Sequence, residues 1–203
     1  MPDLDALPSG LELVALDAQA VRTSVELVGR ATAADLARPT PCAGWELGGL
    51  LAHMTAQHRG FAAASRGDGD PESWTPRPIG DDPVHVYRDA AHQVMEAFAG
   101  EGVLDRMFPL PEVGARPFTA RQAISFHLVD YVVHSWDVAR TLGVTVEFPA
   151  EVLDAAATVA RAVPQGEARL VPGAAFAPEV PWPGGSALDR IVAVLGRSPD
   201  WTG

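Results

Sequence analysis

Residues 118–143 read FTARQAISFHLVDYVVHSWDVARTLG, and this stretch decides the fold. It predicts one long helix, because Thr119 is a good N-cap and Gly143 follows the last residue of the apolar pattern. Apolar side chains lie around most of this helix, which is typical of a helix buried inside a bundle. They are Ile124, Phe126, Leu128, Val129, Tyr131, Val133, Trp136 and Val138.

The same helix carries one polar stripe of histidines and aspartates, because about 100° of rotation per residue brings their positions to one side. The stripe consists of His127, Asp130, His134 and Asp137. Buried imidazoles and carboxylates cost free energy unless they are paired or bind a cation. Asp130 and His134 lie one turn apart, so they predict two ligands of a single metal ion. A third ligand must come from elsewhere in the chain.

Five further helices are expected from apolar periodicity, N-cap residues and a proline at a helix start. Their ranges are 11–31, 45–65, 83–98, 149–163 and 186–195. Four helices of bundle length without an alternating strand pattern predict an all-α, four-helix bundle with additional short C-terminal helices. We expect the bundle and its following helix at 1–163. Residues 164–203 are expected to form an irregular tail whose short helix packs on the bundle.

The composition of the 203 residues argues against several classes of partner. A net charge of −11 that is spread along the chain disfavours nucleic acid and anionic membrane surfaces. We expect neither a membrane span nor a signal peptide, since the chain has no apolar run of about 18 residues and no basic segment before an apolar one. The single Cys excludes an internal disulfide and favours the cytoplasm as the location.

His53, on the expected helix 45–65, is the candidate for the third metal ligand. With Asp130 and His134 it makes a set of two histidines and one carboxylate, which leaves positions open on the ion, as in reactive metal sites. In bundles such sites form from inward-facing side chains of different helices. Asp137 is placed to accept the remaining N–H of a ligating histidine. His127 is a candidate for a further ligand, a proton donor or a substrate contact.

The other polar groups have simpler interpretations. One set on helix 83–98, with apolar residues opposite, is typical of the solvated face of an amphipathic helix. It consists of His85, Asp89, His92 and Glu96. His58 lies five residues after His53, too far around the helix to join it on one ion, and a surface position is expected. Cys42 precedes a helix start, where a thiol pKa is lowered, but a small buried side chain is the simpler interpretation.

Two segments carry a resemblance to a known family. Residues 39–54, PTPCAGWELGGLLAHM, and 127–143, HLVDYVVHSWDVARTLG, resemble the DinB-like metal-binding superfamily. More narrowly, they resemble its actinobacterial branch, related to the N-terminal domain of mycothiol-dependent maleylpyruvate isomerase. Residues 188–201, LDRIVAVLGRSPDW, are similar to the tail of small members of that branch. The most specific parts are the W-x7-H run that ends at His53 and the HSWD run that starts at His134.

The resemblance implies a four-helix bundle that holds a divalent metal, commonly zinc, with Ni²⁺ or Fe²⁺ as alternatives. The ligands of the family carry over to His53, Asp130 and His134, the same residues that the helix pattern selects. The isomerase has Glu where this chain has Asp130. Residues 164–203 are too few for the second domain of the isomerase, which contributes to its active site, so its isomerisation reaction does not carry over with the fold.

Two functional hypotheses follow. The first is a metal-dependent transferase or isomerase that uses a low-molecular-weight thiol such as mycothiol on a small-molecule substrate, or in detoxification, with His127 as the catalytic residue for proton transfer. The second is a metal-binding bundle without catalysis, which serves as a sensor, carrier or stress-response protein. A bundle whose metal site has decayed ranks last. The sequence leaves a homodimer open.

Overall fold

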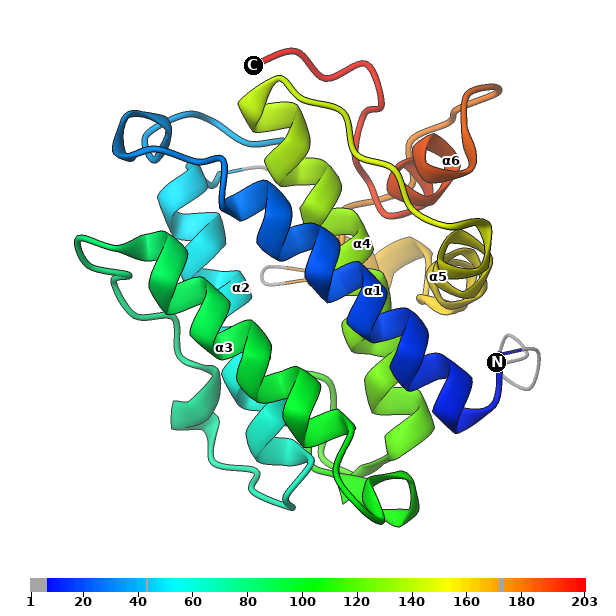
Figure 1. Cartoon of the computed structure of the whole chain (residues 1–203). Helices are drawn as coiled ribbons and strands as arrows, with labels where there is room; N and C mark the ends of the chain where they lie inside the picture. The colour runs from blue at the N-terminus through cyan, green and yellow to red at the C-terminus, as the bar shows by residue number, and fades with distance from the viewer. Residues whose placement is uncertain (1–6, 43, 172–173) are drawn as a thin grey trace.

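The computed structural model describes residues 7–42, 44–171 and 174–203. Within them, four long helices form an all-α bundle, as expected from the sequence. They are α1 (Gly10–Val28), α2 (Leu47–Ala64), α3 (Pro83–Phe98) and α4 (Ala120–Leu142). Figure 1 shows α1 running along α4 and α2 running along α3, and these two helix pairs make the most extensive contacts in the bundle.

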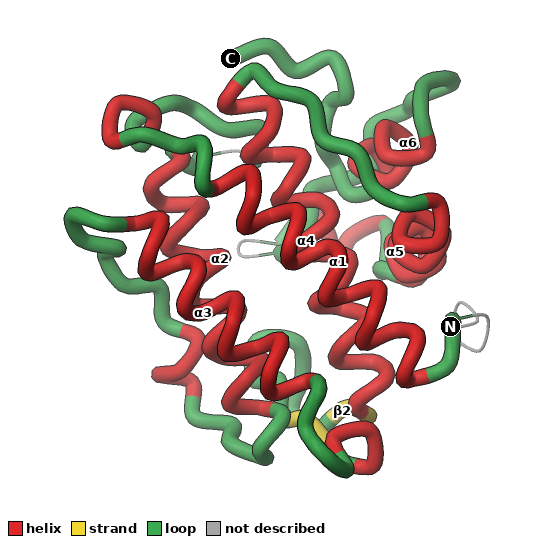
Figure 2. Tube along the Cα trace, in the orientation of Figure 1, coloured by secondary structure: helices red, strands yellow, loops and turns green. Residues whose placement is uncertain are grey.

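The remaining elements surround this bundle. The helix α5 (Ala150–Ala162) packs on α4 and α1, and α6 (Ala187–Val194) packs on α5 and α4. Two very short strands, seen at one end of the bundle in Figure 2, pair antiparallel before α4 begins. They are β1 (Met107–Phe108) and β2 (Phe118–Thr119). Single 3-10 turns in the connections are η2 (Ala33–Asp35), η3 (Pro71–Trp74), η4 (Val103–Asp105) and η5 (Gly166–Arg169).

The helix ends follow from the residues that cap them. Ser9, Thr119 and Ser186 each begin a helix with a capping box, in which the side chain accepts a backbone N–H that would otherwise lack a partner. Gly143 ends α4 at a φ of 70°, a left-handed conformation that glycine adopts at little cost. The predicted helices are present, and the largest difference is the first one, which was expected to reach residue 31 and ends at Val28.

The helix α4 is the centre of the fold, because α1, α2, α5 and α6 all contact it. Its side chains are therefore buried on nearly every side, including polar ones that an exposed helix would leave in water. This position brings the polar stripe of α4 into the interior beside α1 and α2. Among the described residues, no helix has the length and apolarity that a membrane span requires.

Candidate metal centre

The structure brings His53 of α2 together with Asp130 and His134 of α4. One ligand atom of each residue lies within 4.8 Å of the other two, which is a spacing that a single ion can bridge. The Nε2 atom of His134 is 3.3 Å from Oδ1 of Asp130. The rings of His53 and His134 lie edge to face with their centroids 5.4 Å apart. The three residues selected from the sequence therefore form one group.

This group lies at the edge of the interior. The side chain of His134 is only 5% exposed, whereas that of Asp130 keeps 20% of its surface in solvent. His53 is half-buried, and the indole of Trp45 packs against its imidazole at 4.6 Å between centroids. Trp45 is held in turn by its carbonyl, which accepts hydrogen bonds from the backbone and the hydroxyl of Thr40. Of these two ligands on α4, Asp130 is thus the one in contact with solvent.

A buried carboxylate fixes the orientation of His134. Oδ2 of Asp137 lies 2.9 Å from Nδ1 of His134, so the hydrogen bond predicted for Asp137 is present. Because the carboxylate can only accept, His134 carries its hydrogen on Nδ1 and turns Nε2 towards Asp130. The same oxygen accepts a hydrogen bond of 3.1 Å from Arg197, which follows α6. Asp137 is completely buried. Its carboxylate lies between two positively polarised partners, His134 and Arg197.

Arg197 is a residue that the helix pattern did not single out. Its guanidinium is also buried, and the charge of Asp137 raises its pKa although burial alone lowers it. The only signal in the sequence was its place in the C-terminal segment 188–201, which resembles the tail of small family members. For an arginine outside a segment of helical periodicity, the sequence does not indicate which carboxylate forms its ion pair.

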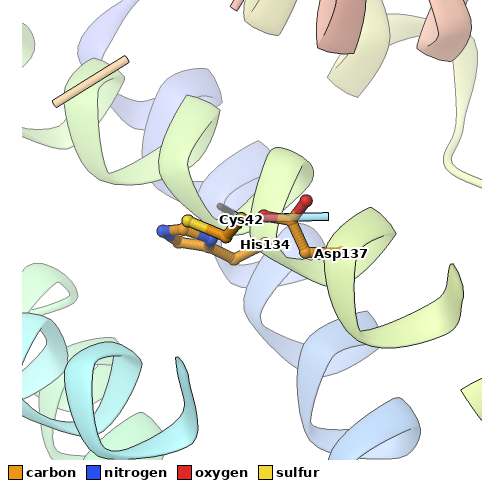
Figure 3. Close-up of side chains that lie close together, drawn as sticks. All are labelled: Cys42, His134 and Asp137. Atoms are coloured by element: carbon orange, nitrogen blue, oxygen red, sulfur yellow. Dashed lines mark hydrogen bonds and ion pairs between the residues drawn. The ribbon is translucent and has the colours of Figure 1, made fainter. Parts of the chain in front are cut away.

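Cys42 lies beside the same histidine, as Figure 3 shows, and its sulfur forms a second close group with His134 and Asp137. Burial raises the pKa of the Cys42 thiol to about 11, although the positive charge of Arg197 acts in the opposite direction. The thiol is therefore protonated near neutral pH, which disfavours a reactive thiolate. The side chain is half-buried rather than fully buried as expected. Arg197, 3.5 Å from the sulfur, already supplies a positive charge at this position.

The charges of the ligand group are set by burial and by one another. Burial, assisted by the charge of His134, lowers the pKa of His53 to about 4, so its imidazole is neutral with a free lone pair. Burial would raise the pKa of Asp130, but the charge and hydrogen bond of His134 outweigh it and lower the pKa to about 2. Burial would lower the pKa of His134, but Asp130 and Asp137 raise it to about 9. In the metal-free protein a proton on His134 balances Asp130.

His127 lies outside the ligand group, in a second buried cluster. Its Nδ1 is 2.7 Å from Oδ1 of Asp17 on α1, and its Nε2 is 3.1 Å from Nδ1 of His58 on α2. The surface position expected for His58 is wrong: the side chain is fully buried, because the ring of Tyr131 covers it at 3.9 Å between centroids. The role of His127 in proton transfer stays a prediction.

Asp17 is a second buried polar residue that the sequence pattern did not single out. The signal was present, since this acid falls among the apolar positions Leu13, Leu16 and Ala20 of α1, all of which are buried. An acid within an apolar stripe requires a buried partner.

By contrast, the set on α3 that was interpreted as a solvated face is exposed, as expected. It comprises His85, Asp89, His92 and Glu96.

Comparisons with known proteins identify relatives of this chain. Residues 18–139 match the family model of the mycothiol maleylpyruvate isomerase N-terminal domain. Two proteins of Mycobacterium tuberculosis, from strains CDC 1551 and H37Rv and both described as uncharacterised, are 30% identical over 175 residues, which is 85% of this chain and 90% of theirs.

Solved structures show the same fold. The crystal structure of the mycothiol-dependent maleylpyruvate isomerase is similar with a TM-score of 0.58 and 16% identity, over 81% of this chain and 73% of that one. A histidine-to-alanine variant of that enzyme gives a TM-score of 0.62 with 14% identity over the same shares. The family match covers more than half of the chain and confirms the resemblance inferred from the sequence. The chain therefore belongs to the mycothiol maleylpyruvate isomerase N-terminal domain family.

Proposed function

We propose that His53, Asp130 and His134 bind one divalent metal ion, with Zn²⁺ as the best match. The observation that carries the proposal is the close approach of one ligand atom from each residue, within 4.8 Å of the other two. Two imidazoles and one carboxylate suit a borderline ion such as Zn²⁺, and Ni²⁺ or Fe²⁺ accepts similar ligands. Three protein ligands leave a position for a small molecule.

On this basis the protein is an enzyme that uses a low-molecular-weight thiol of the mycothiol type on an electrophilic small molecule. Membership of the family supports this choice of thiol. When bound, a divalent ion would stabilise the thiol as a thiolate near neutral pH. The thiol loses its proton and its sulfur bonds to an electrophilic carbon. In an addition, a proton then returns to the product; in an isomerisation, the C–S bond breaks again and the thiol is regenerated; in a substitution, the leaving group departs with the electron pair of its bond to carbon, as chloride does from 1-chloro-2,4-dinitrobenzene.

The residues of the chain prepare the site for this chemistry. His53 offers a lone pair without a competing proton, because its pKa of about 4 leaves it neutral at physiological pH. Asp130 supplies a negative charge that partly neutralises a divalent cation and keeps one side of the group open to solvent. Asp137 and Arg197 hold His134 in the orientation that presents Nε2 to an ion.

The direct test is thiol-dependent consumption of an electrophile such as 1-chloro-2,4-dinitrobenzene by protein purified without a His tag. We expect a rate that requires the thiol, falls when a chelator removes the metal, and returns when Zn²⁺ is added. His85→Ala, which changes an exposed histidine on α3, serves as the control and should behave like the wild type. Equal rates with and without the chelator would contradict the proposal.

The second candidate is a metal-binding bundle without catalysis, a sensor, carrier or stress-response protein. The observation in its favour is the burial of His134, whose side chain is only 5% exposed. This alternative predicts one bound ion per chain and no acceleration of the reaction between thiol and electrophile. The metal content and the thiol assay together therefore separate the two functions.

We expect metal affinity to rise with pH while the stability of the metal-free protein falls. The pKa of about 9 for His134 lies above its ordinary value of 6.5, so its contribution to stability is complete below pH 6.5 and is lost as the pH approaches 9. The same proton must leave before Nε2 binds an ion. The apparent Kd for Zn²⁺ should therefore fall about tenfold per pH unit over this range.

Chelator competition and urea unfolding between pH 6 and 9.5 measure the two quantities. In weakly buffered solution at pH 7, each ion bound should release about one proton, because His134 is then protonated and His53 is not. A Kd for Zn²⁺ that does not change over this range would exclude His134 as a ligand that carries a proton in the free protein.

A further inference from the structure

The two helices that supply the ligands are joined by a hydrogen bond directly beside those ligands. The hydroxyl of Tyr131 on α4 donates to the backbone carbonyl of Met54 on α2. Tyr131 follows Asp130 in the sequence, and Met54 follows His53. The main packing partner of α2 is α3 and that of α4 is α1, so this bond crosses between the two helix pairs.

The ring of Tyr131 is held by a chain of buried polar groups. The imidazole of His58 on α2 stacks on it, with an angle of 7° between the planes. His58 is hydrogen bonded to His127 of α4, and His127 to Asp17 of α1. Each of the three polar side chains is at most 1% exposed. The chain therefore links α1, α4 and α2 in the interior.

When both imidazoles are neutral and Asp17 is ionised, the two hydrogen bonds of this chain allow only one arrangement of hydrogens. A carboxylate only accepts, so His127 donates from Nδ1 and its Nε2 accepts the Nδ1–H of His58. Nε2 of His58 then carries no hydrogen, and it is buried without a hydrogen-bond partner among the described residues. Burial holds the pKa of His58 well below its ordinary value. The stacked imidazole is therefore neutral.

We propose that Tyr131 and the Asp17–His127–His58 chain form a clamp that sets the separation of α2 and α4, and thereby holds His53 where it shares an ion with Asp130 and His134. The inference rests on the proposed metal site. Metal–ligand distances tolerate deviations of only about 0.2 Å, so a ligand on a different helix needs a rigid link to the other two. In this view His127 is a positioning residue that acts through His58 and Tyr131.

The structure offers a matched control for the effect of stability alone. Tyr87 on α3 is also fully buried, and its hydroxyl is 2.6 Å from Oγ of Ser24 on α1. Its ring also lies close to His58, at 5.2 Å between centroids. Tyr87→Phe therefore removes the same atom and one hydrogen bond from the same core, but that bond joins α3 to α1 and leaves the link between α2 and α4 intact.

The experiment compares Tyr131→Phe with Tyr87→Phe and the wild type in the full chain. The Kd for Zn²⁺ is measured by chelator competition, the absorption spectrum of bound Co²⁺ reports the ligand geometry, and urea unfolding of the metal-free protein reports stability. We expect both variants to lose some stability. Only Tyr131→Phe should weaken Zn²⁺ binding, by about tenfold, and alter the Co²⁺ spectrum.

A second variant, His127→Gln, tests the rest of the clamp and should also weaken Zn²⁺ binding. Wild-type Zn²⁺ affinity in His127→Gln would contradict the clamp and fit a role in proton transfer instead. Unchanged affinity in Tyr131→Phe, or an equal loss in Tyr87→Phe, would overturn the clamp and leave the metal site intact. Absence of Zn²⁺ and Co²⁺ binding by the wild type would overturn the metal site and the clamp together.

Discussion

Replacing His134 with alanine should weaken Zn²⁺ binding by more than about 100-fold and abolish thiol-dependent activity. Loss of a hydrogen-bond partner behind a metal ligand typically costs 10- to 100-fold in affinity, and loss of the ligand itself must exceed that. His134 is central to the group, since its Nε2 faces Asp130 at 3.3 Å and its ring faces that of His53. The substitution also leaves Asp130 without the proton that balances it in the metal-free protein.

The measurement is the Kd for Zn²⁺ by chelator competition, with circular dichroism to show that the variant is helical. His85→Ala is the matched control, because His85 also pairs with an aspartate one turn away, at 3.3 Å, but on the exposed face of α3. The control should bind Zn²⁺ like the wild type. A His134→Ala protein with wild-type affinity would exclude the proposed ligand set, whatever its activity.

Replacing Arg197 with methionine should cost about 3–5 kcal/mol of unfolding free energy, the range found when one partner of a buried ion pair is removed. The methionine fills much of the volume but leaves the carboxylate of Asp137 without the guanidinium, one of its two positive partners. That carboxylate is completely buried, so water does not replace the lost partner. Urea unfolding of the metal-free protein at pH 7 measures the change.

The surface pair of Arg38 and Asp35 supplies the control for this prediction. Its atoms lie at a similar distance, 3.2 Å, but the two side chains are 46% and 21% exposed. Arg38→Met should therefore change the unfolding free energy by about 1 kcal/mol or less. Equal losses of unfolding free energy in Arg197→Met and Arg38→Met would show that burial of the Arg197 pair does not increase its contribution to stability.

A double variant separates the stability of the buried pair from its effect on the metal centre. Adding Asp137→Asn to Arg197→Met removes the uncompensated charge and should restore part of the lost unfolding free energy. The amide is a weaker acceptor for Nδ1–H of His134, so Zn²⁺ binding should remain about 10- to 100-fold weaker than in the wild type. If the double variant bound Zn²⁺ as tightly as the wild type, Asp137 would have no part in orienting His134.

Local features of this fold could be predicted from the sequence because they depend on neighbours along the chain. Thr119 and Gly143 delimit α4, since a cap acts on backbone groups within a few residues. The pairing of Asp130 and His134 follows from the geometry of a single helix turn. The hydrogen bond from His134 to Asp137 follows in the same way, because three residues also bring two side chains together on a helix.

The position of His58 shows that helix periodicity alone does not predict which side chains are buried. Periodicity describes a helix surface but not which neighbouring helix covers it, so a polar residue on α2 was expected at the surface and lies in the core. The same limit applies to Arg197, which reaches Asp137 across 60 positions of sequence. No local rule indicates such a partner, because the contact exists only after α6 has packed on α4 and α5.

By itself, the sequence determined the helices, the caps of α4, the all-α class and the two candidate ligands that α4 presents one turn apart. The sequence also made His53 the candidate for the third ligand, and the resemblance pointed to the same residue. Only the tertiary structure decided that His53 lies beside Asp130 and His134, that Arg197 balances Asp137, and that Asp17, His127 and His58 form one buried chain. The physical reason is that helix geometry follows from bonds between near neighbours in the chain, whereas the charge, burial and orientation of a site depend on which helices pack together.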